Sequence, residues 1–129
     1  MPENKLGLQF HGPNPRDFDR ALEVGAGWYG VLDVDAWWYI PRIYQRQPDA
    51  KVILRMVGIS PTRDAPAEVA ERAKSLYDDY RPTALQVGNE WNVGAEHGET
   101  YSAFWSTPEG YNKQLEWWQS FLVAWNNYA

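Results

Sequence analysis

The sequence has no cysteine among its 129 residues and only two histidines. A disulfide framework and a thiolate metal site are therefore excluded, and two histidines alone do not supply the spacing of a metal site. Long hydrophobic runs are also lacking, because no stretch approaches the roughly 18 apolar residues of a membrane span. We expect no metal and no membrane partner, and the composition leaves the cellular compartment open.

Positive charge is in short supply, since 12 Lys and Arg stand against 17 Asp and Glu for a net charge of −5. Nucleic-acid-binding proteins present basic faces, so no nucleic-acid partner is expected. Phosphate-binding loops rich in glycine are missing as well, because the segment His11-Gly12-Pro13-Asn14 has one glycine and no dinucleotide or P-loop spacing occurs. We therefore expect no cofactor. Tryptophan is abundant, with eight residues, and a neutral ligand suits this composition better than an anion.

Short apolar runs alternate with helical patterns along the whole chain. The expected strands are residues 5–12, 28–34, 52–57 and 83–88, and the expected helices are residues 15–24, 41–47, 66–81 and 108–125. Asn14 and Pro15 supply an N-cap and a first helical residue, and Asp17 adds an anion in the first turn. Four strand-helix units in succession predict a single α/β domain, residues 1–129, with a parallel sheet.

Two architectures fit this order of elements. One is a (βα)4 half of a TIM barrel with its strands in the order 1-2-3-4, and the other is an open sheet with helices on both faces. The half barrel leaves an unpaired edge at strands one and four. We expect two-fold dimerisation to pair strand four of each copy with strand one of the other, although a fragment of a longer enzyme is the alternative.

The stretch Leu85-Gln86-Val87-Gly88-Asn89-Glu90-Trp91 places an Asn-Glu pair directly after the fourth strand. It resembles the Asn-Glu that ends the fourth strand of many retaining (β/α)8-barrel glycoside hydrolases, and it favours the half barrel. The resemblance implies a carbohydrate ligand, with Glu90 as the general acid/base and Asn89 as the residue that binds the sugar 2-hydroxyl.

The nucleophile of such a hydrolase is a second carboxylate, about 5 to 5.5 Å from the acid/base in retaining enzymes. The resemblance places it at the end of strand seven, which this chain lacks. In a two-fold dimer, the partner's third strand would take that place, and there it carries Arg55 and Met56 without a carboxyl group. Whether the chain is an enzyme is therefore left open. The alternatives are a non-catalytic carbohydrate-binding half barrel and a structural barrel fragment.

Other candidate ligand residues lie near or after the ends of predicted strands. They are His11, Asp35, Arg55, Trp37, Trp91 and Trp105. Asp35 is preferred to Asp33 as a partner carboxylate because it stands nearer the strand end. Arg55 interrupts an apolar strand, which predicts either a buried ion pair or a sugar contact. The tryptophans can stack on sugar rings or cover the core, and residues 91–106 form a loop long enough to serve a function.

Overall fold

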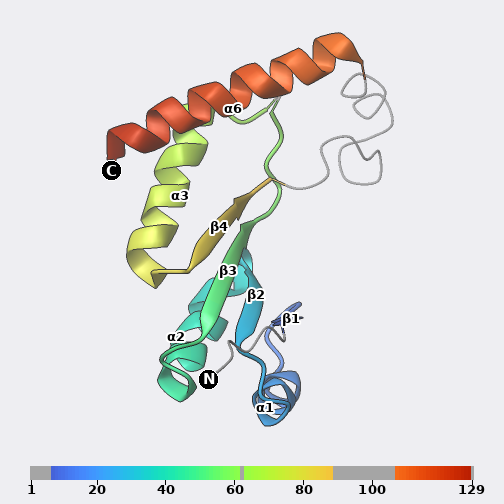
Figure 1. Ribbon diagram of the computed structural model, residues 1–129, viewed down its shortest axis with the longest axis vertical. Coiled ribbons are helices and arrows are strands. Elements are labelled where there is room, and N and C mark those ends of the chain that lie inside the picture. Colours follow the sequence, from blue (N-terminus) through green and yellow to red (C-terminus); the bar gives the residue numbers. More distant parts are fainter. Residues whose placement is uncertain (1–6, 62, 89–106, 129) are drawn as a thin grey trace. The chain divides into compact units, whose positions relative to one another are not determined.

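The computed structural model describes residues 7–61, 63–88 and 107–128. The chain forms two compact units, which are treated separately below. The first consists of Met1–Val57 and Leu76–Gln86, and the second of Gly58–Ser75 and Val87–Ala129. The prediction of a single domain stays a prediction. Figure 1 traces the elements in chain order.

A parallel sheet in the order β1-β2-β3-β4 is confirmed. Its strands are β1 (Gly7–Gln9), β2 (Trp28–Leu32), β3 (Lys51–Met56) and β4 (Ala84–Val87). The strands β2 and β3 run side by side in the same direction (Figure 1), with Trp28 opposite Lys51 and Leu32 opposite Arg55. Beside them, the N–H of Thr83 donates to the carbonyl of Val52 at 2.8 Å, just before β4 begins.

The described helices are α1 (Pro15–Glu23), α2 (Ala36–Arg46), α3 (Pro66–Tyr80) and α6 (Pro108–Tyr128), with a short 3₁₀ helix η1 (Asp33–Asp35). The predicted start of α1 is confirmed, because the side chain of Asn14 accepts hydrogen bonds from the N–H groups of Arg16 and Asp17. These bonds satisfy donors that a helix start leaves without intrahelical partners.

The helices of the first unit pack on one face of the sheet, which we call the helix face. The side chains of Tyr29, Val31, Val52 and Leu54 alternate along β2 and β3 and are almost completely buried. One hydrophobic cluster joins them to Phe18 of α1 and to residues of α2, and Leu76 and Tyr80 of α3 pack against it. Helices on both faces would indicate a doubly wound sheet. The described elements of this unit are instead compatible with a (βα)4 half barrel.

Two expected boundaries between β2 and α2 are wrong. The strand β2 ends at Leu32 rather than residue 34, because the chain turns into η1. The helix α2 begins at Ala36 and holds Pro41 in its interior, five residues before the expected start. A proline removes one helical hydrogen bond. The four buried residues of this helix, Ala36, Tyr39, Ile40 and Ile43, follow the period of one helix face, and their burial outweighs that loss.

The second unit is built on α6 and on the segment that leads into α3. The backbone N–H of Ser60 donates to Oδ2 of Asp64 at 2.7 Å, and Arg63 forms an ion pair with the same carboxylate at 2.8 Å. The indole N–H of Trp117 donates to the backbone carbonyl of Asp64 at 2.9 Å. These contacts tie α6 to the start of α3. None of the described helices is both long enough and apolar enough to cross a membrane.

Candidate functional site at the carboxyl edge of the sheet

The face of the sheet opposite the helix face, here called the second face, carries the alternate side chains of each strand. Its described residues are Gly7, Gln9, Trp28, Gly30, Leu32, Lys51, Ile53, Arg55, Ala84 and Gln86. The side chains in β2 and β3 are mostly half-buried, whereas those at the two outer strands are exposed. The described helices of the first unit pack on the helix face.

Arg55 lies on the second face, next to Leu32 in the sheet register. Its neighbours along the strand, Leu54 and Met56, have 0% exposure because they point to the helix face. Arg55 therefore does not interrupt the buried side chains of β3, because the alternation of side chains along a strand places it on the second face. Arg55 is half-buried near the carboxyl end of β3, the end at which parallel α/β sheets bind their ligands.

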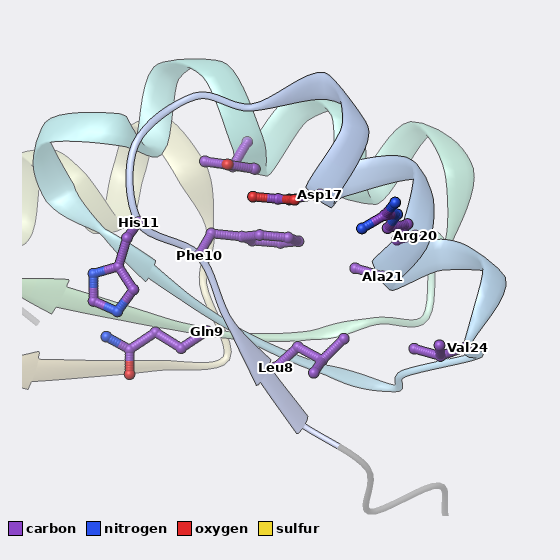
Figure 2. A pocket seen from close by; sticks show the side chains of 9 residues that line it. Leu8, Gln9, Phe10, His11, Asp17, Arg20, Ala21 and Val24 are labelled. Carbon is purple, nitrogen blue, oxygen red and sulfur yellow. The ribbon is translucent and has the colours of Figure 1, made fainter.

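Gln9 occupies the middle of the second face because its neighbour is a glycine. Gly30 pairs with Gln9 in register, and a Cβ atom at Gly30 would stand 3.3 Å from Cγ of Gln9. The glutamine side chain thus lies over the glycine backbone. Figure 2 shows Gln9 and His11 on one side of β1, with Phe10 on the other. An amide group and an imidazole ring are therefore presented from the same side of this strand.

The loop that carries His11 is tied to η1. The N–H of Gly12 donates to Oδ2 of Asp35 at 3.0 Å. Gly12 adopts a φ of 68°, a conformation that a side chain would strain. Asp35 was predicted as a ligand or as a partner carboxylate on a strand. In the structure it stands on η1, where strand alternation does not apply, and one of its oxygens holds the loop.

The hydroxyl of Tyr39 closes the same loop from α2. It donates to the carbonyl of Gly12 and accepts from the N–H of Asn14 at 3.2 Å. Burial raises the pKa of Tyr39 above its ordinary value, and the charges of Asp35 and Asp17 act in the same direction. The phenol therefore remains protonated at neutral pH and keeps its donor role. Its ring stacks on Phe10, with centroids 4.2 Å apart, which fixes the hydroxyl in place.

Asp33 links η1 to the segment that follows β3. Its Oδ1 accepts from the N–H of Val34 at 3.1 Å and from the N–H of Val57, just after β3, at 3.3 Å. The two aspartates of η1 thus link the segments that follow β1, β2 and β3. The carboxyl edge of the sheet is held by side-chain contacts, and this gives the candidate site a preformed frame.

The predicted site residues are distributed unequally. His11, Asp35 and Arg55 belong to the first unit and lie at or near the carboxyl edge. Trp37 stands on the first turn of α2 with 61% exposure. The predicted acid/base Glu90, together with Asn89, Trp91 and Trp105, lies outside the described residues. Their assignment stays a prediction.

Sequence reasoning missed Gln9 and Tyr39. A glutamine in a strand carries no chemical signal of its own, and only the register with Gly30 reveals its position. The position of Tyr39 on a helix could have been predicted. Ala36, Tyr39, Ile40 and Ile43 follow a helical period that runs across Pro41, the residue at which the helix was expected to begin. A phenol at the start of such a helix is close enough to the preceding loops to bond their backbone.

Among the described residues, no cluster of three or more His, Cys, Asp or Glu side chains could hold a metal ion. The geometry instead offers hydrogen-bonding groups around a half-buried, partly apolar surface. Comparison with known proteins found no matching family model, no matching curated protein and no matching solved structure.

Proposed function

We propose that the carboxyl edge of the second face binds a neutral carbohydrate, with Asn89 and Glu90 completing the site. The observation that carries the proposal is the placement of Arg55 near this edge, on the sheet from whose fourth strand Asn89 and Glu90 follow in sequence. Ligands of parallel α/β sheets bind outside the carboxyl ends of the strands. His11 and Arg55 lie at or near that end of the described sheet, and the proposal adds Asn89 and Glu90 to them.

The chemistry of the described groups suits sugar hydroxyls. The guanidinium group of Arg55 offers several donors in a fixed plane, and the amide of Gln9 both donates and accepts. His11 is exposed on the loop held by Asp35. Half-buried Leu32 and Ile53 provide apolar surface between these polar groups. A few polar groups on a mainly apolar lining are typical of small-molecule sites.

Binding without efficient hydrolysis is the form of the proposal that we favour. Glycoside hydrolysis needs a second carboxylate, which positions either a nucleophile or a water molecule. The described carboxylates nearest to this edge, Asp33 and Asp35, each use an oxygen to hold backbone N–H groups. Glu90 is then a candidate acid/base without an assigned partner in this chain.

A second copy of the chain is the proposed partner that encloses the site. A parallel sheet is normally covered on both faces, and a barrel leaves no edges. Two copies related by a two-fold axis supply eight strands, which is the number in a closed (βα)8 barrel. In this arrangement the second faces of both copies line one interior, and the bound sugar lies at its carboxyl end.

The experiment is calorimetric titration of the purified chain with a panel of neutral gluco-, manno-, galacto- and xylo-oligosaccharides. At least one should bind, and Arg55→Met should weaken that binding about tenfold or more, roughly 1.4 kcal/mol. Lys51→Met is the matched control, because Lys51 lies on the same strand and face at the amino end. The affinity of Lys51→Met for the sugar should equal that of the unaltered chain.

Turnover of aryl glycosides is measured in parallel, with Glu90→Gln as the comparison. Slow or absent turnover in both proteins, together with sugar binding, agrees with the proposal. Efficient turnover that Glu90→Gln abolishes would show a complete hydrolase instead. Absence of binding across the panel, in a folded chain, would overturn the assignment to carbohydrate.

A further inference from the structure

We infer that β1 of one copy pairs with β4 of a second copy in parallel, with Leu8 beside Leu85 and Gln9 beside Gln86. The inference rests on the proposed two-fold partner and specifies the register of its contact. The described sheet ends at β1 on one side and at β4 on the other. Among the described strands, these two lie at the sheet edges, where a strand of a second copy can pair.

The two edges carry the same short pattern. β1 reads Gly7-Leu8-Gln9, and β4 begins Ala84-Leu85-Gln86. Leu8 and Leu85 both pack against the core on the helix face, so alternation places the small residue and the glutamine of each strand on the second face. Parallel pairing in this register keeps every apolar side chain on one face. A shift of one residue would put leucine beside glutamine.

The charges of the two edges favour self-pairing. Exposed edge strands are usually protected by lysine, proline or other charged residues. Neither β1 nor β4 contains a charged residue or a proline. Neutral edges meet without like-charge repulsion, and side by side the amides of Gln9 and Gln86 can donate to and accept from one another. Neither charge nor proline therefore opposes pairing at these two strands.

A hollow of about 400 Å³ borders β1 on its outer side, shown in Figure 2. Its lining is mixed. Leu8 and Phe10 of the β1 segment and Ala21 and Val24 at the end of α1 are apolar, whereas Asp17 and Arg20 of α1 are charged. Val24 is 58% exposed there, although it is apolar. In a continued sheet, the helix-face side chain of the next strand enters this space. In the inferred register that side chain is Leu85 of the second copy.

The contact includes the second face as well as the two strand edges. Four strands spaced by about 4.8 Å, each about five residues long, give a face of roughly 300 Å² in projection. Each copy adds both edges and the hollow beside β1 to the buried surface, toward the about 800 Å² per partner that a stable dimer buries.

Cysteine cross-linking tests the register, and the chain suits it because it has no cysteine of its own. Single variants Gln9→Cys and Gln86→Cys are mixed under mild oxidation. Adjacent strands place paired Cα atoms about 4.8 Å apart, within the range that a disulfide spans. The matched control mixes Gln9→Cys with Ala84→Cys, two residues away on the same face, at a Cα separation of about 8 Å.

The Gln9–Gln86 mixture should give at least ten times more cross-linked heterodimer than the Gln9–Ala84 mixture. The mass of the reduced variants in solution is measured by light scattering at tens of micromolar. A dimer with no preference for the Gln9–Gln86 pair, or with Gln9–Gln9 bridges dominant, would overturn the register. A monomer would overturn the dimer as well. Failure of the unaltered chain to bind sugar, when light scattering shows that chain to be a dimer, would count against the carbohydrate proposal alone.

Discussion

Oδ2 of Asp35 accepts a hydrogen bond from the backbone N–H of Gly12 at 3.0 Å, across 23 positions of the chain. This bond joins η1 to the loop after β1, and Asp33 makes the corresponding link to the segment after β3. The sequence predicted Asp35 as a ligand or a second carboxylate, and this stays a prediction. The structure shows that one of its oxygens holds the loop that carries His11.

Asp35→Ala should lower the free energy of unfolding by about 1.5–3 kcal/mol, because a charge-assisted hydrogen bond is lost and the N–H of Gly12 loses its acceptor. Asp35→Asn keeps an acceptor and should cost about half as much. The control is Asp49→Ala in an exposed turn. Chemical denaturation of the three variants measures the differences. Equal stabilities for Asp35→Ala and Asp49→Ala would contradict this role.

Tyr39→Phe should remove about 1–2 kcal/mol of stability while it preserves the ring stacked on Phe10. The pH dependence adds a sharper test. Because burial raises the pKa of Tyr39, its neutral form stabilises the folded chain below about pH 10, and that stability is lost as the pH rises through the folded-state pKa. As the pH rises above about 10, the stability of Tyr39→Phe should therefore fall less steeply than that of the unaltered chain.

Tyr111→Phe is the control for that measurement, since Tyr111 is 59% exposed on α6. The free energy of unfolding of Tyr111→Phe should change with alkaline pH as that of the unaltered chain does. If the free energy of unfolding changes with alkaline pH in the same way for Tyr39→Phe and the unaltered chain, the Tyr39 hydroxyl does not contribute to the pH dependence of stability.

Gly30→Ala should destabilise the sheet by about 1–3 kcal/mol, because the new methyl group would press against Gln9 at 3.3 Å. In a Gln9→Ala background that clash is absent, so the cost should fall by at least half. A double-mutant cycle with the four proteins measures the coupling between the two positions. Additive effects would mean that Gln9 does not lie over Gly30.

The pKa of Asp64 is lowered, first by its hydrogen bond with Arg63 and then by the backbone N–H of Ser60. A lowered carboxyl pKa stabilises the folded state above the ordinary value of about 3.9, and this contribution disappears as the pH falls through the lower folded value. Asp64→Asn should therefore be less stable than the unaltered chain at pH 7, and the difference should shrink toward pH 3. A difference that is equal at both pH values would disagree with this assignment.

The order of the parallel sheet could be predicted because buried strands leave a direct pattern in the sequence. The boundaries around Asp33 and Pro41 could not. A strand pattern does not reveal that the chain turns at Leu32. A proline suggests the start of a helix even where the burial of neighbouring side chains stabilises a helix that contains the proline. On α6, aromatic residues stand at positions 117, 118, 121 and 125, and the buried ones among them are Trp117 and Phe121. Adjacent aromatic ridges have the same period, so spacing alone does not select one.

The candidate site was predicted only where a residue's position in the strand order was informative. His11 and Arg55 follow from their places near strand ends, whereas Gln9 depends on a register that the sequence does not state. The link between Asp35 and Gly12 depends on the turn after β2, which the predicted strand boundary obscured.

Chemical-shift mapping by NMR tests the proposed function most directly, with the chain titrated by the oligosaccharide that binds best in calorimetry. Saturable shifts are expected at His11 and Arg55, at the carboxyl edge, with little change at Trp28 and Lys51, at the amino end of the same face. Shifts confined to the amino end or to the exposed surface of α6, with His11 and Arg55 unchanged, would contradict the proposed function.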